Sequence, residues 1–166
     1  MIRTAQLYKD RLAEEHLKTW YNPEYIFYDY GWNDVINLPD NNFEKRCFVS
    51  VDKNDNILGY ISYRVDENIR QATDLAAICY KKPSIKFVND LQQVIDDIFN
   101  VYNLNRLTWS CCADNPALRG YRKFIKRYGG KEAGYYRETV RTRDGKLRDT
   151  VVFEILKKEY KAGKQE

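Results

Sequence analysis

The order of predicted elements places this 166-residue chain in the α+β class, with a mixed sheet. Three observations support that prediction. Short runs of β-forming residues around turn sequences predict one β-hairpin over 46–65 and another over 135–156. Between the hairpins, strands alternate with segments of helical periodicity. Hairpins at both ends with alternation only in the middle indicate antiparallel and parallel pairing within one sheet.

The first half of the chain begins with a predicted helix over 6–20, which carries Leu7, Leu12 and Leu17. The helix should end before Pro23, because proline disfavours helical conformation in the preceding residue. Strands over 46–51 and 57–65 flank a turn at 53–56. A third strand is predicted over 72–80, where the apolar run 75–79 indicates burial on both faces.

The second half opens with a predicted helix over 83–102, whose apolar residues recur at helical spacing. A strand over 106–112 follows. The next helix should be capped by Asp114 or Asn115, have Pro116 in its first turn, and end at Gly129-Gly130. The last two strands, 135–142 and 147–156, surround an Asp-Gly turn.

Composition indicates a globular protein, because 43% of residues are hydrophobic and 31% are charged. The length suits a single domain over 1–166. No apolar run approaches the roughly 20 residues that span a bilayer, and the N-terminal segment lacks the apolar stretch of a secretory signal. We therefore expect a cytoplasmic protein with no membrane partner.

Four cysteines, Cys47, Cys79, Cys111 and Cys112, fit no zinc-binding spacing, and His16 is the single histidine. We expect four reduced thiols and no metal site.

Charge is divided unevenly along the chain. Residues 1–82 hold 11 Lys and Arg against 13 Asp and Glu, whereas residues 83–166 hold 17 against 11. The second half should favour an anion, which could be a phosphorylated cofactor, an acidic protein or nucleic acid. A basic run follows Asn115 and is a solvated face, an aid to binding the phosphates of a cofactor, or a site for an anionic polymer: Arg119, Arg122, Lys123, Lys126, Arg127 and Lys131.

Aromatic residues are dense between the first helix and the first hairpin. They either cap the core beneath a long connection or form a wall of a small-molecule pocket. The seven are Trp20, Tyr21, Tyr25, Phe27, Tyr28, Tyr30 and Trp32.

The order of elements and the sequence from Arg106 to Tyr160 resemble the GNAT N-acetyltransferases. In that family a strand leads to Asn, then to a helix with Ala and Tyr, then to glycine and a hairpin. The matching residues here are Asn115-Pro116-Ala117, Tyr121, Tyr128-Gly129-Gly130, Asp144-Gly145 and Phe153–Leu156. The resemblance implies the GNAT fold, in which helices flank a mixed, mostly antiparallel central sheet. It is good over 105–160 and holds at fold level over 46–104.

The resemblance also implies acetyl-CoA as co-substrate, with its pyrophosphate at the N-terminus of the helix after the third strand. The corresponding segment, 80–87, contains no glycine. It offers the amides of Ser84, Ile85 and Lys86 and the charges of Lys81 and Lys82. Ile78, Tyr80, Asn115 and Tyr121 complete the cofactor-binding residues that the resemblance implies.

Acetyl transfer requires a base for the amine and an acid for the leaving thiolate. Asp74 on the third strand is the candidate base, ahead of Glu67, and Tyr121 is the candidate acid, with Tyr128 as an alternative. Asp74 could equally be a solvated strand-edge residue, and Tyr121 could be a core residue.

The sequence therefore predicts direct transfer of an acetyl group to an amine of a small molecule or peptide. A catalytically inactive GNAT-fold binding or interaction protein is the alternative, because segment 80–87 lacks glycine. We do not expect nucleic-acid binding, since no recognised motif accompanies the basic helix. The terminal hairpin offers strands that could pair in a homodimer.

Overall fold

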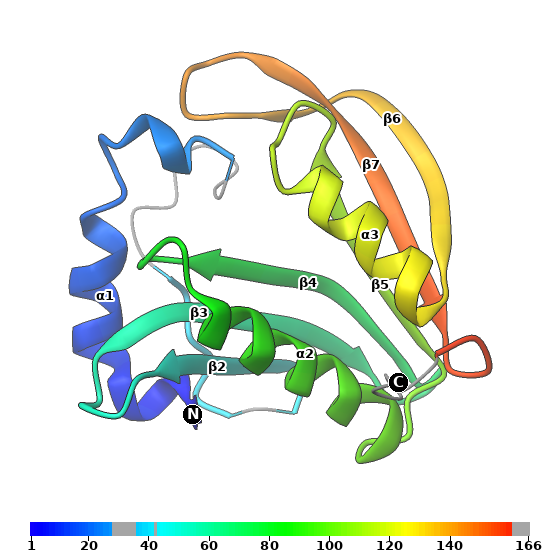
Figure 1. The fold of residues 1–166 in the computed structure, drawn as a ribbon, viewed down its shortest axis with the longest axis horizontal. Coiled ribbons are helices and arrows are strands. Elements are labelled where there is room, and N and C mark those ends of the chain that lie inside the picture. The colour runs from blue at the N-terminus through cyan, green and yellow to red at the C-terminus, as the bar shows by residue number, and fades with distance from the viewer. Residues whose placement is uncertain (28–35, 42, 161–166) are drawn as a thin grey trace.

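The computed structural model describes residues 1–27, 36–41 and 43–160, and within them seven strands form one sheet (Figure 1). The sheet order is β1-β2-β3-β4-β5-β7-β6. The strands are β1 (Ile2–Thr4), β2 (Lys45–Val51), β3 (Ile57–Asp66), β4 (Gln71–Cys79), β5 (Arg106–Cys112), β6 (Lys131–Arg141) and β7 (Leu147–Leu156). The helices are α1 (Lys9–Leu17), α2 (Ile85–Asn100) and α3 (Leu118–Tyr128), with 3₁₀ turns at Ala5–Tyr8 and Pro23–Tyr25.

All neighbouring strands pair antiparallel except β4 and β5, which are parallel. The predicted α+β class and mostly antiparallel mixed sheet are thus confirmed. β5 and β7 have the predicted bounds, and β2, β3 and β4 agree to within one residue at each end. β6 begins at Lys131, earlier than predicted, because its first residues already pair with the end of β7.

The N-terminal segment differs from the single helix predicted over 6–20. Ile2–Thr4 forms β1, which pairs with Phe48–Ser50 of β2 at the edge of the sheet. A 3₁₀ turn follows, and α1 ends at Leu17. Of the predicted apolar stripe, Leu12 is buried, whereas Leu7 and Leu17 are exposed. The N-terminal residues form a strand and not the start of a helix because they pair with β2, which is distant in the sequence.

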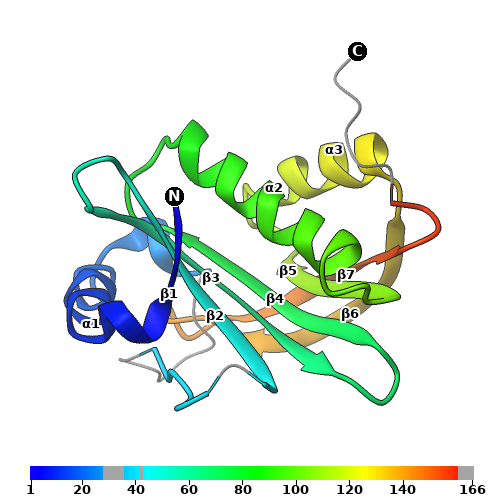
Figure 2. The ribbon, with the colours of Figure 1, turned by 90° about the horizontal axis from the view of Figure 1, so that it is seen from below.

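The helices lie on opposite faces of the sheet (Figure 2). α2 and α3 cover one face, where their apolar residues pack on Leu107, Trp109 and Phe153. α1 lies on the other face, over a smaller cluster that includes Leu12 and Ile78. No helix in the described part of the chain is both long and apolar enough to cross a membrane.

The parallel pair β4 and β5 is joined along only part of its length. Gln71 pairs with Arg106 and Ala72 with Leu107, after which the strands diverge (Figure 1). The run 75–79 is therefore not buried on both faces as predicted, since Ala76 is exposed. Burial on both faces requires a neighbouring strand and helices along the whole run, and here β5 has moved away.

A β-bulge interrupts β4 where this divergence begins. The β3–β4 register passes from Ser62↔Ala76 to Arg64↔Thr73, so Tyr63 alone faces two residues, Asp74 and Leu75. Asp74 accordingly has a positive φ of 53°. A bulge leaves an extra residue unpaired and redirects the side chains that follow it.

Candidate active site

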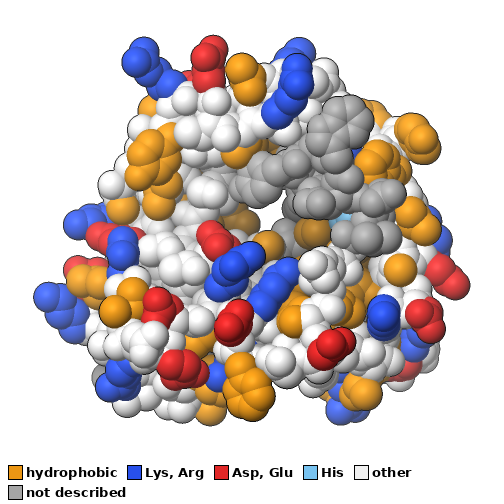
Figure 3. All heavy atoms as spheres, turned by 180° about the vertical axis from the view of Figure 1, so that it is seen from behind, with side chains coloured by type: hydrophobic (Ala, Val, Ile, Leu, Met, Phe, Trp, Pro, Cys, Tyr) orange, Lys and Arg blue, Asp and Glu red, His pale blue; other side chains and the backbone are white. Residues whose placement is uncertain are grey.

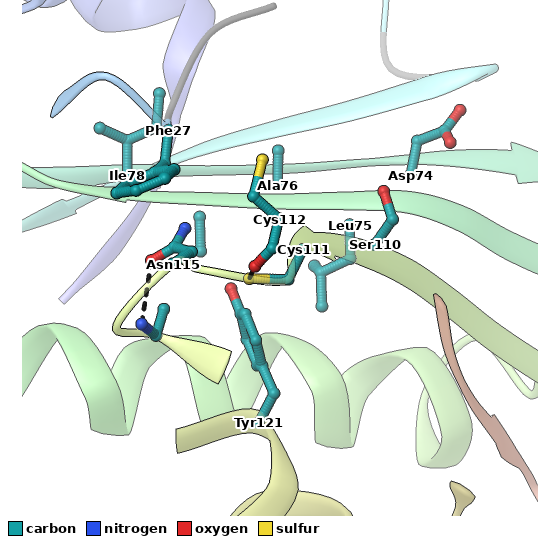
Figure 4. Close-up of a pocket in the computed structure, with 12 residues that line it drawn as sticks. Phe27, Asp74, Leu75, Ala76, Ile78, Ser110, Cys111, Cys112, Asn115 and Tyr121 are labelled. Atoms are coloured by element: carbon teal, nitrogen blue, oxygen red, sulfur yellow. Dashed lines mark hydrogen bonds between the residues drawn. The ribbon is translucent and has the colours of Figure 1, made fainter. Parts of the chain in front are cut away.

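A cavity of about 200 Å³ occupies the space between the diverging strands (Figure 4). We call it the seam cavity. Its walls come from β4, β5, the β5–α3 turn, α3 and Phe27. A second cavity of about 440 Å³, the interhelical cavity, lies between α2, α3 and the same strands. The two share Leu75, Ala77, Ala117 and Tyr121 as lining residues, so they lie next to each other.

The seam cavity reaches both faces of the sheet. Side chains alternate between faces along a strand. On β4, Leu75 belongs to the cluster beneath α2 and α3, whereas Ile78 belongs to the cluster beneath α1. Both line the seam cavity. Figure 3 shows the face opposite α2 and α3, where a hollow opens near the centre. The seam cavity is thus bordered by residues of both faces, and the interhelical cavity lies beside it.

The facing edges of β4 and β5 carry backbone groups that no longer pair with each other. β5 uses its other edge for β7 over its whole length, from Arg106↔Leu156 to Cys112↔Thr150. Unpaired strand edges present rows of N–H and C=O groups. A thin ligand that contains amides could hydrogen-bond to them in place of a strand.

The N-terminus of α2 lies at the mouth of the interhelical cavity. The Ser84 hydroxyl accepts a hydrogen bond from the Phe87 amide at 3.1 Å, and both residues line the cavity. The first-turn amides of Ile85 and Lys86 remain at the positive end of the helix dipole. Lys82 also lines the cavity, with its ammonium 4.3 Å from the ring centroid of Tyr25. An anionic group is therefore favoured here.

The predicted basic residues around this terminus are divided between several partners. Lys81 forms an ion pair with Glu15 of α1 at 3.4 Å. Lys86 forms one with Asp90 at 2.7 Å. Of the three lysines, Lys82 is the one that lines the interhelical cavity.

Two other predicted cofactor-binding side chains lie elsewhere. Tyr80 is buried in the cluster beneath α1, where its hydroxyl is 3.4 Å from Nδ1 of His16. Burial raises the pKa of the Tyr80 hydroxyl. The Ile85 side chain is 81% exposed, so its backbone amide is the group that can contribute to an anion site.

Tyr121 lies where the two cavities meet and lines both. Its ring packs against Trp109 and Phe153, each with a centroid distance of 5.8 Å. Figure 4 shows its hydroxyl pointing from α3 into the seam, toward Cys111. Tyr128 instead packs against Phe124, at 4.7 Å between centroids. Of the two candidate tyrosines, Tyr121 is thus the one at the seam.

Asn115 also lines the seam cavity, in the turn between β5 and α3. Its side-chain oxygen accepts a hydrogen bond from the Ala117 amide at 2.9 Å (Figure 4). The helix begins only at Leu118. The prediction that Asp114 or Asn115 is the N-cap, with Pro116 in the first turn, is therefore wrong, because the Asn115 side chain stabilises a separate turn before the helix.

Asp74 stands at one end of the seam cavity, whereas Glu67 pairs with Arg46 at 3.9 Å. The Asp74 side chain is 75% exposed, and its carboxylate is 3.6 Å from Nε of Arg64. Figure 4 shows this carboxylate directed away from the Tyr121 hydroxyl. Any proton that Asp74 accepts from a ligand in the seam would travel through water.

Three cysteines line the cavities, and all four are free thiols as predicted. Cys111 and Cys112 face the seam cavity and Cys79 the interhelical cavity. Burial raises the pKa of Cys111 to about 12 and also raises the pKa of Cys79 and Cys112. Because the thiolate is the nucleophilic form, these thiols are poorly suited to covalent catalysis.

Among the described residues, no three His, Cys, Asp or Glu side chains are grouped so that they could hold a metal ion. The basic run of α3 is partly neutralised. Arg122 pairs with Glu132 at 2.6 Å and Lys131 with Glu154 at 3.1 Å. Lys123 and Lys126 are exposed, so much of this run is a solvated face.

Sequence reasoning did not single out Cys111 and Cys112 as residues of the site. A strand in which two cysteines follow Ser110 carries no local signal that a gap will open beside it. Phe27 belongs to the aromatic segment that was interpreted as either a core cap or a pocket wall. Both interpretations hold in part, because Tyr25 is buried in the core and Phe27 lines the seam cavity. Tyr28, Tyr30 and Trp32 lie outside the described residues.

No protein-family model matches this chain, and no curated protein does. Solved structures do. A spermidine N-acetyltransferase from Vibrio cholerae, in complex with CoA and spermine, superposes with a TM-score of 0.75 over 96% of each chain at 17% identity.

A point mutant of spermidine N-acetyltransferase SpeG from Vibrio cholerae gives a TM-score of 0.69 over 95% of each chain at 20% identity. Spermidine/spermine N-acetyltransferase SpeG from Vibrio cholerae, in complex with manganese ions, gives 0.69 over 95% of this chain and 92% of the other at 18% identity. At such identities the likeness concerns the fold. The chain therefore has the fold of the GNAT N-acetyltransferases, as its sequence predicted.

Proposed function

We propose that this protein transfers the acetyl group of acetyl-CoA directly to an amine of a small molecule. The observation that supports it is the gap between β4 and β5, where the interhelical cavity adjoins a seam cavity bordered by residues of both faces, so that a cofactor and an acceptor could meet there. The superposed proteins are spermidine and spermine acetyltransferases, so polyamines are the first acceptors to test. Four free thiols support a reducing compartment such as the cytosol.

In this proposal the cofactor enters through the interhelical cavity. Its phosphates lie at the N-terminus of α2, near Lys82 and the amides of Ile85 and Lys86. Its amide-bearing arm lies along the open edges of β4 and β5, where backbone groups are available. The apolar wall formed by Phe87 and Leu91 excludes water from that arm.

The acceptor amine loses a proton, through water, to Asp74 and attacks the thioester carbonyl. The bulge at Asp74 and Leu75 interrupts the ladder beside this point, and a backbone amide freed there can polarise the carbonyl. A C–N bond forms, the C–S bond breaks, and the Tyr121 hydroxyl gives its proton to the departing sulfur. The raised pKa values of the cavity thiols favour this direct route over an acyl-cysteine intermediate.

Calorimetric titration with acetyl-CoA tests the cofactor, and release of free CoA in the presence of spermidine or spermine tests the reaction. We expect Tyr121→Phe to lower kcat about 100-fold or more, the usual contribution of a positioned acid. Tyr128→Phe is the matched control on the same helix and should retain activity. Absence of binding at millimolar acetyl-CoA, or full activity in Tyr121→Phe, would contradict the proposal.

The two neighbouring lysines give a sharper test of the cofactor site. Lys82→Ala should weaken acetyl-CoA binding, because Lys82 lines the cavity, whereas Lys81→Ala should have a smaller effect, since Lys81 pairs with Glu15. Equal losses in the two variants would refute the assignment of the phosphates to this position.

One set of observations favours the second candidate function, a GNAT-fold binding protein without catalysis. The segment before α2 contains no glycine, and both Lys81 and Lys86 are engaged by carboxylates. For this candidate, acetyl-CoA binds but no amine in the panel releases CoA. Turnover with any amine excludes it.

A further inference from the structure

One wall of the seam cavity comes from a distant part of the chain. Among the described residues that line this cavity, Phe27 alone lies outside 74–121. It follows the 3₁₀ turn Pro23–Tyr25 and is half-buried. Its ring has the guanidinium of Arg148 over it, 4.9 Å from the ring centroid. The position of this wall therefore depends on where Arg148 is held.

Arg148, in β7, is held by three side chains from two other parts of the fold, the β6–β7 turn and the β5–α3 turn. Its Nε donates to the Thr142 hydroxyl at 2.8 Å, and one terminal nitrogen donates to Asp144 at 2.6 Å. The other terminal nitrogen donates to Asp114, in the turn that also carries Asn115. The side chain of Arg148 is only 12% exposed. A planar guanidinium with every edge engaged keeps a fixed orientation, which a lysine ammonium would not reproduce.

A second contact fixes the same N-terminal segment. Arg143, in the turn between β6 and β7, donates to the Thr19 carbonyl at 3.0 Å, and its guanidinium lies 4.7 Å from the Trp20 ring centroid. The β6–β7 hairpin thus contacts the chain at Thr19–Trp20, through Arg143 of its turn, and again at Phe27, through Arg148 of β7. This arrangement explains why a segment so far from β4 in sequence reaches the seam.

The seam cavity beside Phe27 is apolar where it reaches the face beneath α1. Ala76 and Ile78 of β4 line it there (Figure 4). An apolar wall favours carbon atoms of a ligand rather than its charged groups. It suits the carbon chain next to an amine whose nitrogen lies deeper in the seam.

We infer that Arg148 is a positioning residue, which holds Phe27 against the seam cavity so that Phe27 selects acceptor amines by the carbon chain they carry. The selection of acceptor amines by Phe27 rests on the proposed acetyl transfer, whereas the positioning of Phe27 by Arg148 does not. The acceptor class is an amine with an unbranched aliphatic chain. Each methylene buried against the wall should raise kcat/KM about fourfold.

A series of n-alkylamines of increasing length, with acetyl-CoA, measures this selection. For the unchanged chain, kcat/KM should rise with each methylene until the wall is covered. In Phe27→Ala, kcat/KM should rise less with each added methylene. Arg148→Gln and Arg148→Lys should show the same smaller rise, with an unchanged dissociation constant for acetyl-CoA. Arg106→Gln removes another arginine–carboxylate pair, with Glu154, from the far end of β5 and β7 and should keep the rise. A rise that persists in Arg148→Gln would overturn the inference.

A second measurement needs no turnover. The δ1-methyl signal of Ile78 in isoleucine-methyl-labelled protein reports on the aromatic ring at the same cavity. The methyl of Ile98, a buried residue of α2, is the internal reference. Arg148→Gln should move the Ile78 signal toward its position in Phe27→Ala and leave Ile98 in place. An unmoved Ile78 signal would refute the positioning role. A moved signal with no acetylation of any amine would retain that role and reject the proposed function.

Discussion

Gly59 in β3 offers the sharpest test of how α2 is seated on the sheet. It pairs with Cys79 of β4, and the Phe87 side chain of α2 packs against it. A Cβ at Gly59 would lie 2.3 Å from Cε2 of Phe87 and 2.4 Å from the Ile78 carbonyl oxygen. Phe87 is 5% exposed, and the carbonyl belongs to the strand next to Gly59, so neither atom can move away cheaply.

Gly59→Ala should therefore destabilise the protein by about 1–3 kcal/mol, the usual cost of overpacking a core. For a chain of this length, that corresponds to a fall in Tm of about 2–4 °C per kcal/mol. Acetyl-CoA binding should weaken as well. Phe87 lies in the first turn of α2, where Ser84 caps its amide, so displacing the ring shifts the helix terminus.

Equilibrium unfolding in urea measures the free-energy change, and calorimetry measures acetyl-CoA binding. Gly134→Ala is the matched control, because Gly134 also lies in a strand but a Cβ there would find its nearest neighbours at 3.8 Å. If Gly59→Ala proved as stable as Gly134→Ala, the close packing of α2 on β3 would be refuted.

Two further predictions concern titration and thiol chemistry. Burial alone would raise the pKa of Asp90, but hydrogen bonds from Lys86, Ser50 and the amino terminus outweigh it and lower the pKa. Asp90→Asn should therefore cost about 1–3 kcal/mol at neutral pH. This difference should shrink as the pH falls below about 4 and through the lowered pKa, and a difference independent of pH in acid unfolding curves would contradict it. Cys79, half-buried at the interhelical cavity, should react with iodoacetamide faster than Cys111, and acetyl-CoA should slow that reaction; peptide mapping that shows no protection would place the cofactor elsewhere.

The elements best predicted from sequence are those determined by local pattern. β5 and β7 follow from runs of β-forming residues with clear turns beside them. The N-terminal segment was misread, because Ile2–Thr4 becomes a strand only by pairing with β2, more than forty residues away. The burial of 75–79 was misread for the same reason: whether β5 stays beside β4 is not encoded within that run.

In the candidate site, too, some features could be predicted from the sequence and others depend on tertiary packing. Asp74, Ile78, Asn115 and Tyr121 were predicted from a family resemblance, and the fold brings all four to the seam cavity. The partners of the lysines could not be predicted. Lys81 meets Glu15 only because α1 packs on the opposite face of the sheet.

The short pairing of β4 with β5 has a mechanical consequence. The sheet consists of two parts, β1–β4 and β5–β7, which are joined only where Gln71 pairs with Arg106 and Ala72 with Leu107. Ala72 and Leu107 are fully buried, and β4 and β5 diverge beyond them (Figure 1). The angle between β4 and β5 at this junction determines the width of the seam cavity. A change of side-chain volume at Ala72 or Leu107 would therefore alter the width of the seam cavity, although neither residue lines it.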